Sequence, residues 1–197
     1  MSVIRFPRSG DDVDTPVIVF VDLQREYVTN GRAHALACRE PWWSNCLRLL
    51  EFARERGLPV AHFRQLRREP YFNRATPFAD WIDEFRPSPH EMVFERSQPS
   101  CYSNDSFSTL LDSLSSPRFL LAGLTGESSC LATVFDAYRR GHCTALVADA
   151  SDSHALGDYA ESVVHGVVSE IAALFGDVVS TSQIVTRLAG KKPSLAG

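Results

Sequence analysis

The run Val17-Ile18-Val19-Phe20-Val21-Asp22 (VIVFVD, residues 17–22) decides the fold class. Five consecutive apolar residues, most of them β-branched, are typical of a strand buried on both faces, as in a parallel sheet covered by helices. The run ends in a carboxylate, which is costly inside a core and is better placed where the strand ends. The sequence therefore predicts a buried strand that delivers Asp22 to one edge of a sheet.

Further segments repeat this pattern, and helical segments separate them. Short apolar runs predict strands over 59–63, 92–95, 118–123, 143–149 and 177–180, and helical periodicity predicts helices over 43–56, 107–114, 128–140 and within 158–175. Alternating strands and helices favour a parallel sheet with helices on both faces. The expected fold is α/β: a doubly wound, three-layer α/β/α domain around a mostly parallel six-stranded sheet.

Length and composition agree with one domain. The chain has 197 residues and a formal net charge of −4, so no basic face for nucleic acid is expected. No apolar run approaches the roughly 18 residues that span a bilayer, so no membrane partner is expected. The first residues, MSVIRFPRSGDD, lack the apolar stretch of a signal peptide, so a cytoplasmic location is expected. We expect a flexible arm over 1–15, a single domain over 16–185 and a tail over 186–197.

Ligands of doubly wound sheets bind beyond the carboxyl ends of the strands. This rule selects Asp22, Arg96 after the strand at 92–95, and the turn at 123–129. Asp22 is either a general base or a carboxylate that only caps a loop or helix. Arg96 either acts on an anionic substrate or a nearby nucleophile, or is a solvated surface residue.

The turn Gly123-Leu124-Thr125-Gly126-Glu127-Ser128-Ser129-Cys130 joins a strand to a helix. Backbone N–H groups at the start of a helix suit an anion or an oxyanion. The turn offers two nucleophile candidates, Ser129 and Cys130, and the helix dipole favours their ionised form. In the simpler alternative, Ser128 or Ser129 only caps the helix.

The segment 64–92 forms a long irregular excursion between two strands, of the kind that often carries binding surface. His62, inside a strand, is expected to be a packed core residue, whereas His154, beyond a strand end, is a candidate for the binding pocket. Three arginines of the excursion either meet an acidic group of a substrate or form a solvated face: Arg67, Arg68 and Arg74.

Three motifs, taken in order, resemble the isochorismatase-like hydrolases, a family that includes nicotinamidases and N-carbamoylsarcosine amidohydrolase. Residues 17–27 (VIVFVDLQREY) resemble the opening strand of the family, 96–102 (RSQPSCY) its K-x-x-x-S-A-F segment, and 123–141 (GLTGESSCLATVFDAYRRG) the segment with its catalytic cysteine. The resemblance covers about residues 16–185. It implies a hydrolase that cleaves the C–N bond of a small amide through a covalent acyl-enzyme, with Asp22 as the catalytic base.

The catalytic positions themselves depart from the family pattern. Counting back from Thr133, the position of the catalytic cysteine falls on Ser129, and the position of the catalytic lysine falls on Arg96. Cys130 does not easily replace the missing thiol, because one step along a helix turns the side chain by about 100°. A one-residue offset would instead bring Glu95 near the site.

Three hypotheses account for these departures. In the first, the natural enzyme has a cysteine at position 129, and this chain is a Cys-to-Ser variant that binds its amide but acylates slowly. In the second, the protein is an isochorismatase-type hydrolase, which cleaves a vinyl ether by acid and water chemistry and lacks the cysteine. In the third, the site is catalytically degenerate and the domain serves in binding or assembly. The sequence leaves all three open.

The resemblance also implies how the substrate is held. Backbone N–H groups of Thr125 and Ser129 would form the oxyanion hole, and a cis peptide bond would join Leu124 to Thr125. Tyr27 and Tyr102 would contact the substrate in one cavity.

Cofactors and partners follow from the same resemblance. The nicotinamidase branch binds a metal through an Asp and His residues after its second strand, but residues 64–92 contain only His90 and no D-x-H pattern. No metal and no other cofactor are therefore expected. The expected partners are a small-molecule substrate and further copies of the chain, in a homodimer or homotetramer.

Overall fold

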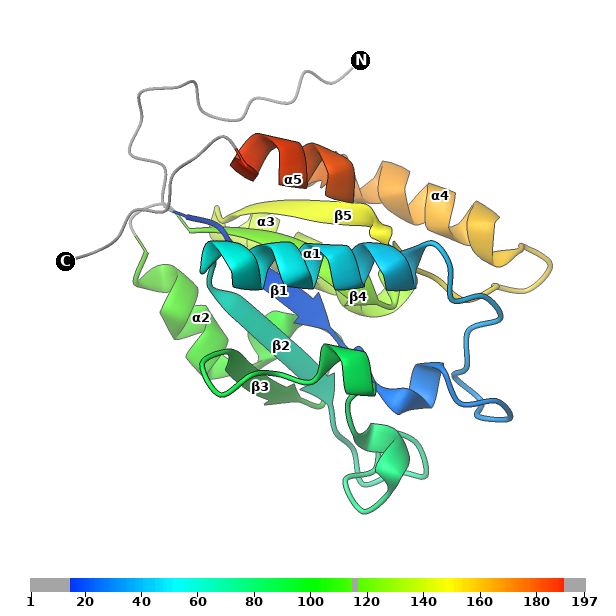
Figure 1. The fold of residues 1–197 in the computed structure, drawn as a ribbon. Coiled ribbons are helices and arrows are strands. Elements are labelled where there is room, and N and C mark those ends of the chain that lie inside the picture. Colours follow the sequence, from blue (N-terminus) through cyan, green and yellow to red (C-terminus); the bar gives the residue numbers. More distant parts are fainter. Residues whose placement is uncertain (1–14, 115–116, 190–197) are drawn as a thin grey trace.

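A six-stranded sheet forms the centre of the computed structural model, which describes residues 15–114 and 117–189 (Figure 1). The strands are β1 (Val17–Val21), β2 (Val60–Gln65), β3 (Met92–Arg96), β4 (Arg118–Leu124), β5 (Cys143–Asp152) and β6 (Asp177–Val179). Their order is β3-β2-β1-β4-β5-β6, and every neighbouring pair is parallel. The predicted sheet is therefore confirmed.

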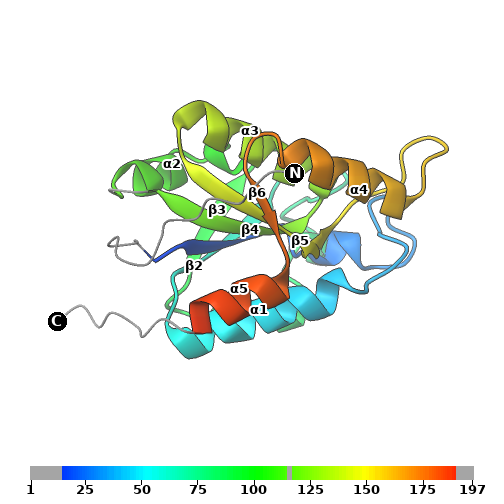
Figure 2. The same cartoon turned by 90° about the horizontal axis from the view of Figure 1, so that it is seen from above.

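Helices cover both faces of this sheet. They are α1 (Trp42–Arg56), α2 (Asp105–Asp112), α3 (Leu131–Arg140), α4 (Glu161–Ala172) and α5 (Thr181–Ala189). Seen from above, α1 and α5 lie on one face, and α2, α3 and α4 lie on the other (Figure 2). The strand order reverses between β1 and β4, and ligands of such folds bind outside the carboxyl ends of the strands at this point.

The central strand β1 supplies side chains to two cores. Ile18 and Phe20 belong to the core beneath α1, which also contains Trp42. Val19 belongs to the core on the opposite face, together with Phe107 of α2. The continuous apolar run at the start of the chain is thus explained by burial on both faces.

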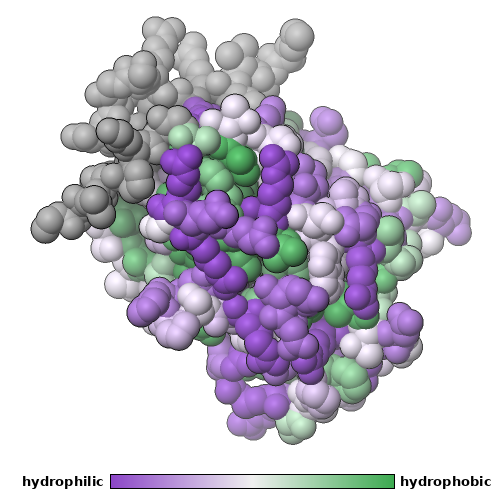
Figure 3. Space-filling model, in the orientation of Figure 1, coloured by the Kyte–Doolittle hydropathy of each residue, from purple (hydrophilic) through white to green (hydrophobic). Residues whose placement is uncertain are grey.

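Helix α1 shows the expected amphipathic pattern. Its inward residues Cys46, Leu49, Leu50 and Ala53 are buried, and the helix ends at Gly57 in a left-handed conformation with φ of 62°. The face of the molecule that carries α1 is mostly hydrophilic, with apolar residues in small separate patches (Figure 3). Within the described residues, no helix has both the length and the apolar character needed to cross a membrane.

The boundary near the carboxyl terminus differs from the expectation. Helix α5 was not predicted, and it continues to Ala189, so the expected domain end at residue 185 lies inside a helix and residues 186–189 are not part of a tail. The segment buries only Thr181 and Ile184, which is too short an apolar pattern to indicate a helix. Residues 1–14 and 190–197, which hold nearly all of the expected arm and most of the expected tail, lie outside the described residues.

Candidate active site

A tight turn at the end of β1 fixes Asp22 at the edge of the sheet. Asp22 has a φ of 53°, in the left-handed region that aspartate tolerates better than most residues. Its N–H donates to the Phe63 carbonyl at 2.8 Å, and its carbonyl accepts from the N–H of Gln24 at 2.7 Å. The side chain is fully buried. Backbone contacts on both sides therefore hold the carboxylate in place.

Glycine at position 123 lets β4 approach β1 closely at this edge. Gly123 has a φ of 111°, and a Cβ atom there would lie 2.2 Å from the carbonyl oxygen of Val21 and 2.7 Å from its nitrogen. Any larger residue would collide with the β1 backbone. The glycine thus brings the turn after β4 against the residue that precedes Asp22.

Arg96 reaches the same point from the end of β3. Its Nη2 donates to Oδ2 of Asp22 and, at 2.6 Å, to Oγ of Ser129, and its Nη1 donates to the carbonyl of Gln98. The neighbouring Glu95 is partly exposed and pairs with arginines of the excursion instead. Because alternate residues of a strand point to opposite sides, the position beside Asp22 belongs to Arg96 and not to Glu95.

Ser129 completes the group from the first turn of the next helix. It lies in a π-helical turn, Gly126–Cys130, that runs into α3. Its hydroxyl accepts from Arg96 and donates to Oδ2 of Asp22 at 3.3 Å. Thr133 supports it, because its hydroxyl donates to the Ser129 carbonyl at 2.8 Å and accepts from the N–H of Cys101 at 3.0 Å. This double contact explains why a threonine stands four residues after Ser129.

Cys130 points away from this group. Its thiol is fully buried among the apolar side chains on the α3 face, where Sγ lies 3.7 Å from the Gly123 carbonyl. Burial raises the pKa of this thiol far above its usual range, so it stays protonated. The position that faces Asp22 is Ser129, as the motif spacing predicts.

The site holds a carboxyl group with a perturbed affinity for protons. Burial raises the pKa of Asp22 to about 6, and the charge of Arg96 and the hydrogen bond from Ser129 partly offset the rise. Oδ1 of Asp22 has no hydrogen-bond partner among the described residues. An unpartnered buried oxygen beside a polar cluster is free to meet a substrate atom or a water.

A cluster of aromatic and imidazole rings lies beside this group. Tyr27 packs against Phe72 and His154, with ring centroids 5.2 and 6.0 Å away, and His34 joins all three. His154 donates from Nδ1 to Glu127 at 2.9 Å and from Nε2 to the His34 carbonyl at 3.0 Å. The bond with Glu127 raises the pKa of His154. His34 and Glu127 were not predicted here, because their contacts join segments far apart in the sequence.

Tyr102 does not share a cavity with Tyr27, contrary to the expectation. It packs on the α2 side of the sheet against Phe107 and Phe119, and its hydroxyl donates to Nδ1 of His142 at 2.8 Å. Tyr27 belongs to the opposite core. The short helical turn after Ser100 directs the ring into the interior. His62 is, as expected, a buried core residue, and its Nε2 lies 2.9 Å from Glu91.

The turn beneath the hydroxyl has the backbone form that was expected. The peptide bond between Leu124 and Thr125 is cis. The use of the Thr125 and Ser129 N–H groups as an oxyanion hole stays a prediction. In the part of the chain that the structure describes, no group of three or more His, Cys, Asp or Glu side chains is arranged to hold a metal ion.

Together, the strand order and the polar group at the point where it reverses place the chain among the doubly wound α/β hydrolases. Residues 16–183 match the isochorismatase domain, so the chain belongs to that family. It is 23% identical over 192 residues to N-carbamoylsarcosine amidase of an Arthrobacter species, covering 88% of this chain and 71% of the relative.

Solved structures agree with this assignment. An isochorismatase from Pseudomonas putida KT2440 is 26% identical and superposes with a TM-score of 0.79 over 86% of this chain and 89% of its own. A putative hydrolase of the isochorismatase family from Chromobacterium violaceum is 23% identical, with a TM-score of 0.82 over 97% of this chain and all of its own. A cysteine hydrolase from Pseudomonas syringae, 18% identical, shows the same fold with a TM-score of 0.82 over 96% and 98% of the two chains.

Proposed function

We propose that this site hydrolyses the C–N bond of a small amide through an acyl intermediate on residue 129. The observation that carries the proposal is the position of the Ser129 hydroxyl, which contacts both Asp22 and Arg96 in a buried site at the start of a helix. The amidase relative from Arthrobacter supports the choice of an amide.

The chain's own groups suffice for the proton transfers. Oδ2 of Asp22 accepts the proton of residue 129 as that side chain attacks the amide carbonyl, and the N–H groups of Thr125 and Ser129 stabilise the oxyanion. When the C–N bond breaks, the proton on Asp22 passes to the leaving nitrogen and ammonia departs. Asp22 then takes a proton from a water molecule whose oxygen attacks the acyl group, and the proton returns to residue 129 as the acid leaves.

Arg96 has an electrostatic role in this scheme. A guanidinium group stays protonated at ordinary pH, so Arg96 transfers no proton. Its charge lowers the pKa of Asp22 against the effect of burial and so keeps more of that carboxyl ionised. It also donates to the attacking oxygen and lowers the charge that develops there.

A serine at position 129 makes the first step slow. A hydroxyl is far less acidic than a thiol, and a carboxylate with a pKa of about 6 is a weak base for it. A thiol has an ordinary pKa of about 8.5, much closer to that of the carboxyl group. Binding is therefore expected to survive in this chain, with acylation restored by a cysteine.

Replacing the serine tests the proposal. Ammonia release from a panel of small amides is measured for the unmodified chain, for Ser129→Cys and for Ser128→Cys. The last is the matched control, because Ser128 is exposed and one residue away from the position that faces Asp22. We expect release by Ser129→Cys that is orders of magnitude faster than by the other two. No release by Ser129→Cys on any amide contradicts the proposal.

One observation favours the isochorismatase-type alternative. The group that faces Asp22 is a hydroxyl, and a carboxyl with a pKa of about 6 retains part of its proton near neutral pH, as a general acid must. In that scheme Asp22 protonates the vinyl-ether carbon, and water adds to the resulting cation before the ether C–O bond breaks. Pyruvate release from isochorismate by the unmodified chain tests it. If neither assay shows turnover, the degenerate binding domain is the remaining hypothesis.

A further inference from the structure

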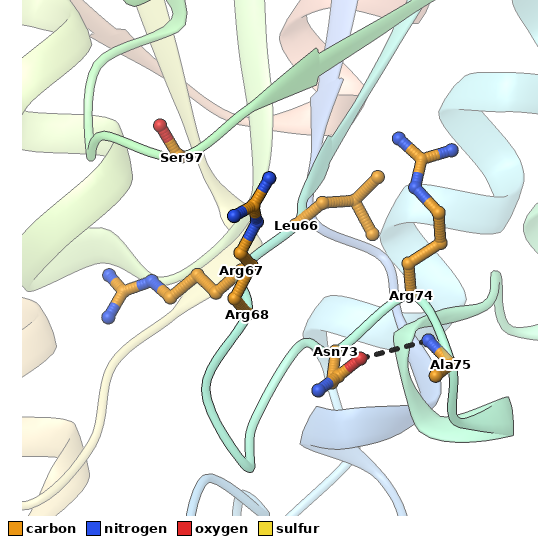
Figure 4. Close-up of a pocket in the computed structure, with 7 residues that line it drawn as sticks. All are labelled: Leu66, Arg67, Arg68, Asn73, Arg74, Ala75 and Ser97. Carbon is orange, nitrogen blue, oxygen red and sulfur yellow. Dashed lines mark hydrogen bonds between the residues drawn. The ribbon is translucent and has the colours of Figure 1, made fainter.

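The excursion between β2 and β3 forms a groove lined by three arginines. The groove has a volume of about 810 Å³ and is lined by Leu66, Arg67, Arg68, Asn73, Arg74, Ala75 and Ser97. Figure 4 shows the three guanidinium groups spread around it, with Arg67 between Arg68 and Arg74 in the view. No acidic residue lines the groove.

The groove adjoins the active site. The N–H of Leu66 donates to the carbonyl of Arg96 at 2.8 Å, and Ser97 follows Arg96 directly. The charge of Arg67 lowers the pKa of Asp22, so the guanidinium acts electrostatically on the catalytic carboxylate. A ligand whose reacting end contacts Ser129 therefore extends past Arg96 into the groove.

Part of the groove is held in a defined geometry. Gln65 is buried, and with its amide oxygen turned toward the guanidinium it accepts from Nε of Arg67 at 2.5 Å and from Nη2 at 2.7 Å. The backbone N–H of Arg67 donates to the carbonyl of Phe72 at 2.9 Å, and the Asn73 side chain accepts from the N–H of Ala75 at 2.9 Å. These bonds brace the loop that presents the arginines.

The positive charge of the groove is incompletely balanced. Arg67 has one exposed partner, Glu69, at 3.3 Å, and exposed pairs of this kind contribute little. Glu95 is shared between Arg74 and Arg64. Arg68 has no carboxylate partner among the described residues. This excess stands out in a chain whose formal net charge is −4.

We propose that the groove binds a carboxylate at the far end of the substrate, so that the substrate is an amide of an acid: a linear amido acid whose amide lies at Ser129 and whose carboxylate lies among Arg67, Arg68 and Arg74. The choice of an amide rests on the proposed function. The anionic end does not, because it follows from the charge and position of the groove. Arginine suits this role because its guanidinium binds carboxylates through two parallel hydrogen bonds.

Binding to the unmodified chain tests the groove without turnover. Calorimetry compares succinamate with succinamide, which has the same length but an amide in place of the carboxylate, and malonamate and glutaramate vary the span. We expect at least one amido acid to bind about tenfold or more tightly than its diamide, and the difference to shrink in 0.5 M NaCl. Equal affinity for acid and diamide at every length, or no binding of any amido acid, overturns the proposal.

Variants locate the contact. Arg67→Gln and Arg68→Gln are each expected to weaken amido-acid binding about tenfold and to leave diamide binding unchanged. Arg139→Gln is the matched control, because Arg139 is exposed near the end of α3, about 15 Å along that helix from Ser129. Unchanged binding by both groove variants refutes the assignment. Inorganic phosphate as a competitor reports the end group: displacement at lower concentration than acetate means a phosphate-like end and overturns the carboxylate.

The two proposals fail in different ways. If amido acids bind through the groove but Ser129→Cys releases no ammonia from them, amide hydrolysis is wrong and the anionic subsite stands. If Ser129→Cys hydrolyses diamides as fast as amido acids, the hydrolase proposal stands and the anionic subsite is wrong.

Discussion

Replacing Gly123 by alanine is expected to damage both stability and the site, because this glycine sets the distance between β4 and β1. The added Cβ would lie 2.2 Å from the Val21 carbonyl oxygen and 2.7 Å from the Val21 nitrogen, both of them backbone atoms in the centre of the sheet. Val21 precedes Asp22, so any movement that relieves the collision displaces the carboxylate from Ser129.

Two effects contribute to the expected loss of stability. A φ of 111° is unfavourable for any residue with a Cβ and costs about 1–3 kcal/mol. Crowding against backbone that moves little costs about 1–3 kcal/mol more. The free energy of unfolding of Gly123→Ala is therefore expected to fall by about 2–6 kcal/mol.

Two other glycines separate these effects in a chemical denaturation series. Gly31 has a φ of 82° with no atom near its added Cβ, so Gly31→Ala reports the backbone cost alone. Gly166, in α4, has neither problem, so Gly166→Ala is expected to gain about 0.5–1 kcal/mol. A loss for Gly123→Ala no larger than that for Gly31→Ala refutes the argument that close contact at Val21 positions the site.

Other measurements test individual groups. The carboxyl of Asp22, followed by carbon NMR, is expected to titrate near pH 6, and kcat/KM of Ser129→Cys is expected to fall below that pH as the base becomes protonated; a midpoint near 4 contradicts the effect of burial. Adding Arg96→Lys to Ser129→Cys is expected to raise ammonia release about tenfold, because an ammonium group exchanges protons and a guanidinium does not; an unchanged rate means that protonation at this position is not limiting. Tyr102→Phe is expected to lose about 1 kcal/mol of stability with its bond to His142, and to leave ligand binding intact. Light scattering is expected to give a multiple of 21.9 kDa, whereas a mass of 21.9 kDa itself excludes the homo-oligomer under those conditions.

The parts of the fold that depend on local pattern could be predicted from the sequence. A continuous apolar run identified β1, and the carboxylate that ends it identified Asp22. Fixed spacing from Thr133 identified Ser129, because both residues lie on one helix face and are joined by a hydrogen bond. Helix α5 was missed, since its short segment buries few side chains.

The surroundings of the site could not be predicted in the same way. Glu127 and His154 are 27 residues apart, and the His34 carbonyl that accepts from His154 is 120 residues from it. Contacts of this range depend on how the loops at one edge of the sheet pack together, and no local periodicity encodes them. Tyr102 was misplaced for a related reason: its loop reaches the site through Arg96, but the helical turn that follows directs the tyrosine into the opposite core.

The buried pair of Asp22 and Arg96 has a consequence for how this domain can evolve. Removing either partner of such a pair leaves an isolated charge and typically costs about 3–5 kcal/mol, a large share of the stability of a small protein. Ser129 carries no comparable penalty, so a lineage released from selection for turnover would change that residue first and keep the ion pair. In a comparison of distant relatives, the persistence of the acid and the cation would then report the requirement to fold, and the residue at position 129 would be the better record of whether chemistry is still under selection.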